Sequence, residues 1–531
     1  MALTRLDNRP PYKQRFARNQ WPDEKPPHGE LAELYAPAVP TLQYQLLSRL
    51  LTSNIPNDPI CSDFAYTIQF LTDPALHGGE PTSKFAEPKS ALLPDEQAAL
   101  LSASLAEPYT GPHTTATVRA FMRREMKKLK FRRRTIFHTI CANNTGRMPA
   151  HRLMQVRSYH ILFAMTSRKK FAAGRDFKSF YHQFEFDPRV REILRYRHGD
   201  ALFQLTRAAM GHKGSAAAAH TTSKAIVLLS LFRAGKTPAQ VHYDIIIDDV
   251  LFMSDSMDDL EAVCSAFDEI CAEIRATIGS RTDPDTVITH RGVEFDFERC
   301  LRRVKPATIL KLQARYDYFC RSPTLPRLRS ILGAVMFCRT VMCIDVGDLL
   351  RAVIKAEISN TLPDRLVYEE VIQRALRNDW IANTSVDTMP YGGTVVTDAT
   401  LERWAAIFVD QHGDVTSSSG RVEPAPIHVS EALATLHAVE LLPTFDVPHK
   451  VEFLTDNTVW LYSMHRSYAR CAELQSIRSD FMERLRVRNI FPVLAYIASS
   501  DNPADNPSRE REVDSGLLQR ARSVAEFLQA K

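Results

Sequence analysis

The stretch VHYDIIIDDVLFMSD, residues 241–255, decides the fold of the middle of this chain. Two apolar runs rich in β-branched residues flank Asp248 and Asp249, and this pattern predicts a β-hairpin with two carboxylates at its tip. Asp is also a favoured turn residue, so the pair taken alone is more often an ordinary turn than a site. The interpretation therefore depends on the sequence around it.

A third carboxylate precedes the hairpin in RDFKSFYHQFEFDP, residues 175–188, where Asp176 leads into a strand. Between them, FQLTRAAMGHKGSAAAA (203–219) predicts a strand, a Gly-rich turn and a helix of small residues. Three carboxylates from two strands can hold two divalent cations about 3.5–4 Å apart. Because Mg²⁺ prefers carboxylate oxygens in octahedral geometry, the segment predicts a magnesium-dependent site for phosphoryl transfer.

A basic run lies upstream, at residues 119–134, and is opposed only by Glu125. Most runs of this kind form a solvated helix face, and the alternative is a surface that contacts phosphates. Its members are Arg119, Arg123, Arg124, Lys127, Lys128, Lys130, Arg132, Arg133 and Arg134.

Four further carboxylates lie near the C-terminus. Asp398 and Asp456 end the strand-like runs TVVTD and VEFLTD. Glu431 is expected in the first turn of a helix, and Asp505 lies in the loop DNPADNPSRE. Each has a plain explanation alone, as a turn former, a helix-dipole charge or a loop residue. Together they fit one small domain and favour a second site. In chain order they are Asp398, Glu431, Asp456 and Asp505.

The composition is that of an ordinary globular protein. The chain has 531 residues, 44% hydrophobic and 24% charged, which excludes collagen, a coiled-coil rod and wholesale disorder. The net charge of +5 is a mild excess, so the global charge does not by itself indicate a nucleic-acid binder. Nine Cys without a C-x2-C pair, and no apolar signal segment at the start, predict a soluble intracellular protein of the cytoplasm or nucleus.

The central segments resemble the successive palm motifs of a reverse transcriptase. RDFKSFYHQFEFDP resembles the first motif, MGHKGSAA the second, and IIDD takes the place of the Y-x-D-D box. FRRRTIFHTICANN (131–144) resembles a fingers segment, and HRGVEFDF (290–297) is similar to a primer-grip segment. The resemblance implies a polymerase that copies RNA into DNA.

The resemblance also implies roles for single residues. Asp176, Asp248 and Asp249 would bind metal, and Tyr181 would lie beneath the incoming sugar and favour dNTPs. Two departures from the family pattern are Ile246, where an aromatic residue is usual, and His290–Arg291, where the primer grip usually has Phe-Leu. The residues expected to contact the triphosphate or line the nucleotide pocket are Lys127 or Lys128, Arg134, Met210 and Gly211.

The C-terminal segments T-D-A-T, T-D-N and N-P-A-D-x-P-S-R resemble the ribonuclease H domain of hepadnaviruses and of tyrosine-recombinase retroelements. The resemblance implies that Asp398, Glu431, Asp456 and Asp505 hold two Mg²⁺ or Mn²⁺ ions for hydrolysis of an RNA strand. Some retroviral domains carry a His before the last Asp, and YIASSDNPAD has none. By motif, the whole chain is similar to DIRS-like or VIPER-type retroelement polymerases, and more distantly to hepadnaviral and LTR-element polymerases.

The expected fold is α+β and multidomain, a right-hand polymerase with fingers, palm and thumb followed by an α/β ribonuclease H-like domain. The expected partners are an RNA template, a DNA primer, an RNA/DNA hybrid and dNTPs, with two Mg²⁺ or Mn²⁺ ions per site. No membrane partner is expected, and the oligomeric state is left open. The expected divisions are 1–110 as an extension of unknown role, 111–300 as fingers and palm, 301–385 as thumb and connection, 386–512 as ribonuclease H, and 513–531 as a helix.

Two alternatives stay open at this point. A retroelement-derived nucleic-acid-binding or assembly protein without polymerase activity is suggested by Ile246 and the altered primer grip. A second alternative keeps only the ribonuclease H active. Against both, all seven carboxylates are present in the sequence.

Overall fold

The computed structural model describes most of the chain. The described residues are 33–35, 38–78, 91–127, 130–139, 143, 146–147, 153–359, 361–383, 389–466, 469, 471–514, 516 and 518–519. Of the expected N-terminal extension, 1–110, nearly all of the part before residue 38 therefore falls outside the described residues. Most of the expected helix at 513–531 also falls outside them.

The chain divides into two compact units. The first contains residues 1–155, 177–229 and 267–279, and the second contains 156–176, 230–266 and 280–531. Four of the points where the chain crosses between units lie inside a helix or strand, namely β5 (Phe171–Phe177), α8 (Lys213–Arg233), α9 (Met257–Glu273) and β10 (Ile278–Asp285).

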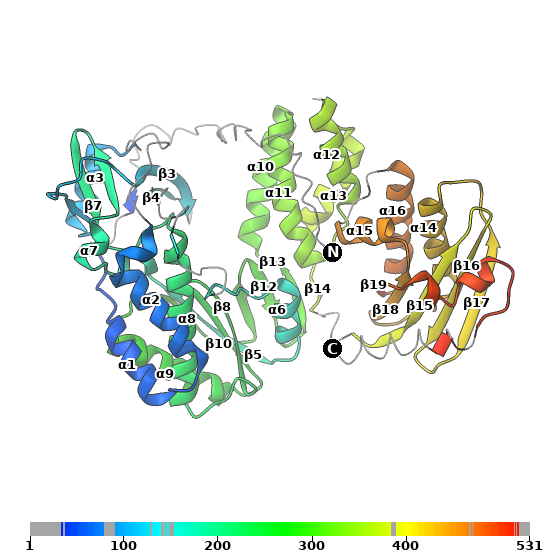
Figure 1. Cartoon of the computed structure of the whole chain (residues 1–531), viewed down its shortest axis with the longest axis horizontal. Helices are drawn as coiled ribbons and strands as arrows, with labels where there is room; N and C mark the ends of the chain where they lie inside the picture. The colour runs from blue at the N-terminus through cyan, green and yellow to red at the C-terminus, as the bar shows by residue number, and fades with distance from the viewer. Residues whose placement is uncertain are drawn as a thin grey trace. The chain divides into compact units, whose positions relative to one another are not determined.

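The first unit contains two three-stranded sheets, of order β1-β4-β3 and β2-β7-β6. Its other elements are mainly helices, among them the part of α8 up to Leu229 (Figure 1). In chain order the elements are β1 (Glu33–Tyr35), α1 (Tyr44–Asn54), α2 (Pro59–Thr72), η1 (Pro74–His77), α3 (Pro94–Ser102), β2 (Ala106–Pro108), β3 (Arg119–Lys127), β4 (Lys130–His138), η2 (Phe180–Gln183), α7 (Pro188–Arg191), β6 (Arg195–His198) and β7 (Ala201–Leu205).

The basic run forms strands, so the expectation of a helix face is wrong. β3 and β4 pair antiparallel, from Arg119 opposite His138 to Lys127 opposite Lys130. Ala120 and Phe137 face each other in this register, and both are buried. The burial of these two side chains shows that apolar packing, which net charge does not describe, also contributes to this hairpin.

The second unit begins with the sheet that carries the hairpin. Its strand order is β10-β5-β9-β8, and a second sheet has the order β11-β12-β13-β14. Helices α10 to α13 lie beside the second sheet (Figure 1). The elements are α6 (Tyr159–Thr166), β8 (Val241–Ile246), β9 (Asp249–Ser254), β11 (Val287–His290), β12 (Val293–Asp296), β13 (Leu301–Val304), α10 (Pro306–Arg321), α11 (Leu325–Met342), α12 (Gly347–Ser359), α13 (Arg365–Arg377) and β14 (Ile381–Ala382).

These elements share one hydrophobic core. Met253 of β9, Phe295 of β12 and Val335 of α11 are all fully buried in it. Helices α10 to α13 thus bury their apolar faces against the sheets, within the range 301–385 that was expected as thumb and connection.

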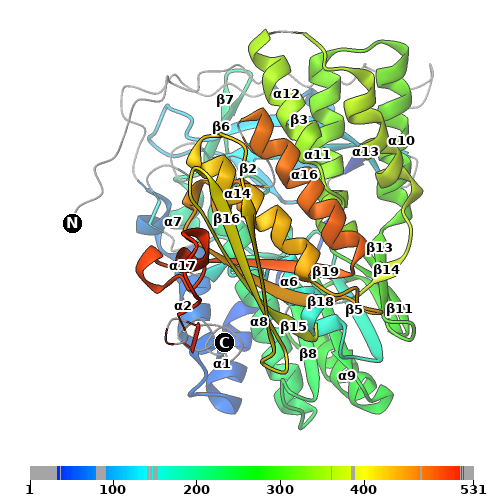
Figure 2. The same ribbon diagram turned by 90° about the vertical axis from the view of Figure 1, so that its right-hand side faces the viewer.

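A five-stranded sheet of order β17-β16-β15-β18-β19 follows. Helices α14 and α16 cover one face of it (Figure 2). Successive side chains of β15 point to opposite faces of the sheet. Val395 packs with the helices, and Val396 packs on the other face with Ile497. The elements are β15 (Tyr391–Ala399), β16 (Arg403–Asp410), β17 (Val415–Arg421), α14 (Ile427–Ala438), η4 (Val439–Leu441), β18 (His449–Thr455), α15 (Thr458–Arg466), α16 (Ala472–Val487), β19 (Ile490–Tyr496), η5 (Ser499–Asp501) and α17 (Asp505–Ser508).

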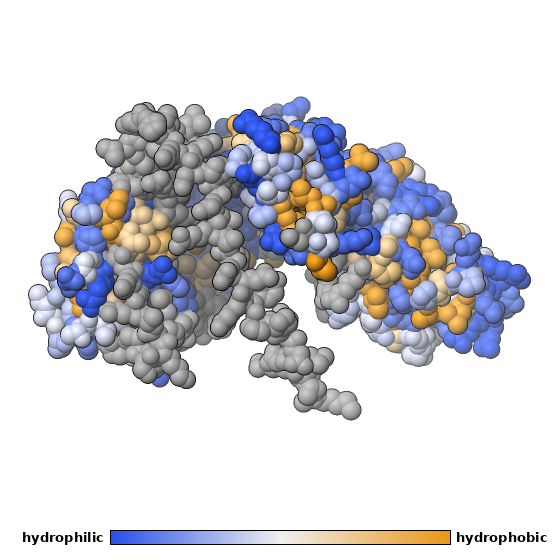
Figure 3. Space-filling model, turned by 90° about the horizontal axis from the view of Figure 1, so that it is seen from above, coloured by the Kyte–Doolittle hydropathy of each residue, from blue (hydrophilic) through white to orange (hydrophobic). Residues whose placement is uncertain are grey.

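Hydrophilic residues predominate on the face drawn in Figure 3, and apolar residues form small separate patches there. Among the described residues, none of the helices combines the length and the apolar character that a membrane crossing needs.

Candidate active sites

The predicted hairpin is present and brings two of the expected carboxylates into register. β8 and β9 pair up to Ile246 opposite Asp249, which leaves a two-residue turn of Ile247 and Asp248. β5 pairs antiparallel with the other edge of β9 and sets Asp176 directly opposite Asp249. Directly opposed residues have Cβ atoms about 4.5–5.5 Å apart. Asp176, Asp248 and Asp249 therefore lie at one end of neighbouring strands of one sheet. We call them the hairpin carboxylates.

Ile247 has a left-handed backbone, with φ of +60°. This conformation is an outlier for a β-branched residue and costs about 1–3 kcal/mol. The strain falls in the turn beside Asp248, a place where stored strain commonly accompanies function.

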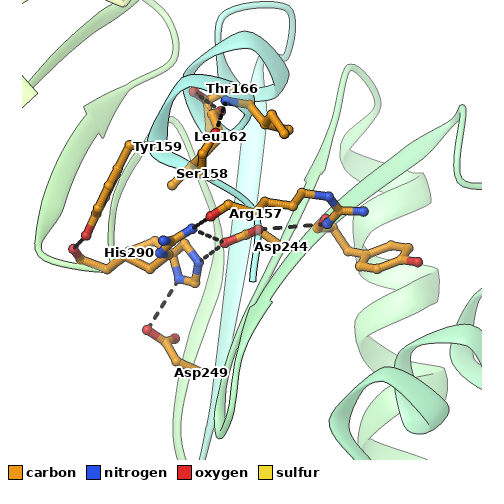
Figure 4. Close-up of polar contacts among 11 residues, drawn as sticks. Arg157, Ser158, Tyr159, Leu162, Thr166, Asp244, Asp249 and His290 are labelled. Atoms are coloured by element: carbon orange, nitrogen blue, oxygen red, sulfur yellow. Dashed lines mark hydrogen bonds and ion pairs between the residues drawn. The ribbon is translucent and has the colours of Figure 1, made fainter. Parts of the chain in front are cut away.

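Asp249 has a partner that the sequence did not indicate. Its Oδ2 atom lies 3.3 Å from His290 Nδ1, and the other ring nitrogen of His290 lies 2.9 Å from Asp244 Oδ2. Figure 4 shows His290 between the two carboxylates. Burial alone would lower the pKa of His290, but its contacts with Asp244 and Asp249 raise it. Burial alone would raise the pKa of Asp244, but His290, Arg291 and Arg157 lower it. His290 therefore contacts both a buried carboxylate and one of the hairpin carboxylates.

The residues expected to bind the nucleotide lie in the first unit. Arg134 Nη1 lies 3.7 Å from Met210 Sδ, and the Phe137 backbone N–H donates to the Met210 carbonyl at 2.8 Å. Gly211 has φ of +112°, and a Cβ there would lie 2.3 Å from the Phe137 carbonyl oxygen. Only glycine therefore fits this close approach.

The structure says less about the expected nucleotide-binding roles of Tyr181 and Lys127. Tyr181 lies in η2, next to His182. Burial and the guanidinium groups of Arg134 and Arg207 lower the pKa of His182 to about 4, which places Arg134 near this segment. Lys127 ends β3, and its side chain lies outside the described residues, as does all of Lys128.

The C-terminal carboxylates come from separate elements around one end of the five-stranded sheet. Asp398 is near the end of β15, and Asp456 directly follows β18. These strands are parallel, with Val396 beside Leu454, so their carboxyl ends meet at one edge. Glu431 lies in α14, and Asp505 is the first residue of α17. The group is Asp398, Glu431, Asp456 and Asp505.

Electrostatics shows that the C-terminal carboxylates converge. Burial raises the pKa of Asp398 to about 6, the charges of Asp456 and Asp505 add to the rise, and a Ser508 hydrogen bond opposes it. Burial together with the charges of Asp456 and Asp398 raises the pKa of Glu431 to about 7. Such mutual repulsion requires that the carboxylates lie close together.

Two serines hold this group, and the sequence prediction missed both. Ser508 Oγ donates to Asp398 Oδ2, and Ser499 Oγ donates to Asp456 Oδ2, each at 2.6 Å. The available signal for Ser508 was its position in the N-P-S-R segment, three residues after Asp505.

Asparagines hold the backbone of the same site. Asn502 is fully buried, and its amide donates to the Thr397 carbonyl at 3.0 Å, next to Asp398. Asn457 donates to the His428 carbonyl at 2.9 Å, which ties the end of β18 to the start of α14. These bonds fix the elements from which the carboxylates project.

The C-terminal residues fit a divalent cation by their chemistry. Asp456 Oδ1 is buried and accepts no hydrogen bond, and the group holds more negative charge than nearby cations neutralise. Oxygen donors of this kind are the ligands of Mg²⁺ and Mn²⁺. Within the described ranges, no three His, Cys, Asp or Glu side chains form a ready metal-binding group.

Comparison with known proteins gives a weak likeness. No protein-family profile and no curated protein sequence matches the chain. Solved structures of a foamy viral protease-reverse transcriptase are similar over most of it. The form named dRH, in complex with double-stranded DNA, has 13% identity and a TM-score of 0.44 over 88% of this chain and 83% of that one.

Two further structures of the foamy viral protein give comparable values. The complex with an RNA/DNA hybrid has 15% identity and a TM-score of 0.46 over 88% of this chain. This chain spans 64% of that protein's length, less than two thirds. A complex with double-stranded DNA has 14% identity and a TM-score of 0.45 over 87% of this chain and 99% of that one. At these scores the likeness assigns no function, and the resemblance to DIRS-like or VIPER-type elements stays a prediction.

Proposed function

We propose that this chain is an RNA-directed DNA polymerase with ribonuclease H activity, acting on an RNA template, a DNA primer and the resulting hybrid. The observation that carries the proposal is the grouping of the seven carboxylates chosen from sequence. Three belong to one edge of the β5-β9-β8 sheet, and four surround the carboxyl ends of β15 and β18.

The hairpin carboxylates would form the polymerase site and would bind Mg²⁺ or Mn²⁺. When bound, a pair of divalent cations stabilises the attacking and leaving oxygens of phosphoryl transfer. Asp176 and Asp249 are held opposite each other by strand pairing, so the carboxylates are positioned before a nucleotide arrives. Within the first unit, Arg134 lies beside Met210, and these two residues and Gly211 are the ones expected from the sequence to contact the nucleotide.

The C-terminal carboxylates would form the ribonuclease H site. Ser508 and Ser499 orient one oxygen each of Asp398 and Asp456, and the buried Asp456 Oδ1 is left for a ligand. Glu431, whose pKa is raised to about 7, can exchange a proton near neutral pH. These features suit hydrolysis of an RNA strand.

Primer extension on poly(rA)/oligo(dT) with Mg²⁺ or Mn²⁺ tests the polymerase. Metal-dependent incorporation of dTTP that Asp248→Asn abolishes and Asp456→Asn leaves intact would support it. Cleavage of the RNA in a labelled hybrid, lost in Asp456→Asn, tests the ribonuclease. A folded chain that binds the hybrid and has neither activity would instead be a binding or assembly protein.

A further inference from the structure

The contact between His290 and Asp249 has no role in the proposal above. His290 ends β11 and is 1% exposed, whereas the Asp249 side chain is 38% exposed. A buried imidazole thus reaches from the interior to a carboxylate at the sheet edge. Figure 4 shows the ring pointing toward Asp249 on one side and toward Asp244 on the other.

A tight turn places His290 there. β11 and β12 are joined by Arg291 and Gly292, since His290 pairs with Val293. Both turn residues have positive φ, +50° and +80°. Positive φ at both central positions defines a type I′ turn, whose twist matches the strands on either side. This turn directs His290 and Arg291 onto the same carboxylate, that of Asp244.

Asp244 is fully buried and lies near two arginine side chains. Arg291 Nη1 lies 3.4 Å from its Oδ2 atom, and Arg157 Nη1 lies 3.8 Å from its Oδ1 atom. Two guanidinium groups therefore lie beside this carboxylate in addition to His290. The imidazole uses one nitrogen for Asp244 and has its second nitrogen 3.3 Å from Asp249 Oδ2, so it links the buried carboxylate to a hairpin carboxylate.

The surrounding contacts hold this cluster rigid. The Arg291 guanidinium lies over the Tyr159 ring, 4.5 Å from its centroid, and donates to the Arg157 carbonyl at 2.8 Å. Tyr159 Oη donates in turn to the Arg291 carbonyl at 2.9 Å. A partner locked in this way can orient a ligand side chain, as residues behind metal ligands commonly do.

We propose that His290 is a positioning residue of the polymerase site, held by Asp244 and fixing the Oδ2 atom of Asp249. With Oδ2 engaged, Oδ1 is the oxygen that Asp249 presents to a divalent cation. This inference rests on the proposed polymerase function. It also gives a role to His290, which stands where the primer grip usually has Phe. A Phe at this position could contact neither Asp244 nor Asp249 through a polar atom.

Manganese binding tests the inference without catalysis. The full chain would carry Asp398→Asn and Asp456→Asn to silence the second site, and free Mn²⁺ would be followed by electron paramagnetic resonance. His290→Phe removes both polar contacts and keeps a ring. It is expected to weaken Mn²⁺ binding about 10–100-fold, the usual effect of losing a residue behind a ligand. His290→Gln, which can still donate to Asp249, is expected to recover part of the loss.

Primer extension gives the second readout, in the otherwise unsubstituted chain. His290→Phe is expected to lower kcat about 10–100-fold and to leave the dTTP KM and the ribonuclease activity unchanged. His242→Phe is the matched control, because His242 lies on β8 in the same sheet and its strongest electrostatic contacts are Lys169 and Asp255. Thermal unfolding verifies that each variant is folded.

The outcomes separate the inference from the function on which it rests. If folded His290→Phe binds Mn²⁺ and extends primers within about twofold of the wild type, His290 is only a counter-charge for Asp244 and the inference is overturned. If the wild type extends no primer, the proposed polymerase fails instead. An Asp244→Asn variant that weakens Mn²⁺ binding, with no further loss on adding His290→Phe, would show that the two residues act as one unit.

Discussion

The two carboxylate groups of this chain manage their negative charge differently. In the hairpin group, Asp249 is paired with a buried imidazole that belongs to a compensated cluster around Asp244. In the C-terminal group, Asp398 and Asp456 accept hydrogen bonds from serine hydroxyls, and burial together with mutual repulsion raises the pKa values of Asp398 and Glu431. The comparison teaches that carboxylates can be brought together either beside a buried imidazole or with hydroxyl partners and raised pKa values.

Exchanging single carboxylates gives the largest expected effect. Asp248→Asn is expected to reduce primer extension on the order of 10³-fold or more, the upper cost of removing one electrostatic stabiliser of developing charge. Asp456→Asn is expected to do the same to RNA cleavage. Each variant serves as the control for the other, in parallel steady-state assays. If either substitution abolished both activities, the two groups would not be separate sites.

Loss of a hydroxyl partner is the next largest effect. Ser508→Ala removes the donor to Asp398 Oδ2 and is expected to lower ribonuclease activity about 10–100-fold. Since that hydrogen bond lowers the pKa of Asp398, its loss also moves the acidic limb of the pH–rate profile to higher pH. Ser463→Ala is the matched control, because the Ser463 hydroxyl donates to its own helix at the Val459 carbonyl. An unshifted profile would contradict the role of Ser508.

The raised pKa values make stability depend on pH. Asp398 and Glu431 bind protons more tightly when folded, so the stabilisation is complete below about pH 4, where both states are protonated. It is lost as pH rises through about 6 and 7. In EDTA, Asp398→Asn is therefore expected to raise the free energy of unfolding at pH 8 by about 1–2 kcal/mol, after allowance for partial exposure.

Denaturant unfolding at pH 4.5 and pH 8 measures this effect. The gain from Asp398→Asn should shrink at the lower pH, and added Mg²⁺ should stabilise the wild type more than the variant. Asp249→Asn is the comparison in the hairpin group. Because the Asp249 side chain is 38% exposed and contacts His290, that variant is expected to gain nothing at pH 8, and an equal gain would remove the distinction between the groups.

The smallest effect is expected at Arg509. Its guanidinium contacts Asp505 Oδ1 at 2.7 Å, four residues apart on the surface, and the Arg side chain is 54% exposed. Exposed pairs of this kind contribute about 0–1 kcal/mol. Arg509→Gln should therefore change the free energy of unfolding by less than about 1 kcal/mol. A larger loss would mean that the C-terminal group also depends on a protein cation.

Local sequence was enough to predict the elements that carry the carboxylates. Short apolar runs ending in Asp predicted the β8–β9 hairpin, β15 and β18, because a buried strand and its terminal turn are encoded by neighbouring residues.

The partners of the carboxylates were not predictable in the same way. His290 and Asp249 are 41 positions apart and meet through two hairpins, so no local pattern encodes their contact. The basic run was misjudged because it was interpreted by charge alone, whereas Ala120 and Phe137 of the same hairpin lie opposite each other and are buried. Which residues bind nucleotide and metal stays a prediction.

The way in which the chain crosses between its two units has a consequence for synthesis on the ribosome. The first unit includes residues 267–279, so its first 155 residues lack part of their fold until that segment emerges. At translation rates of about 5–20 residues per second, the wait is roughly 6–25 s. Residues 389–514 instead form their sheet from one continuous stretch and can close as soon as they leave the exit tunnel. The N-terminal part of the nascent chain therefore stays incomplete after it has been made, whereas the C-terminal sheet has all its strands at once.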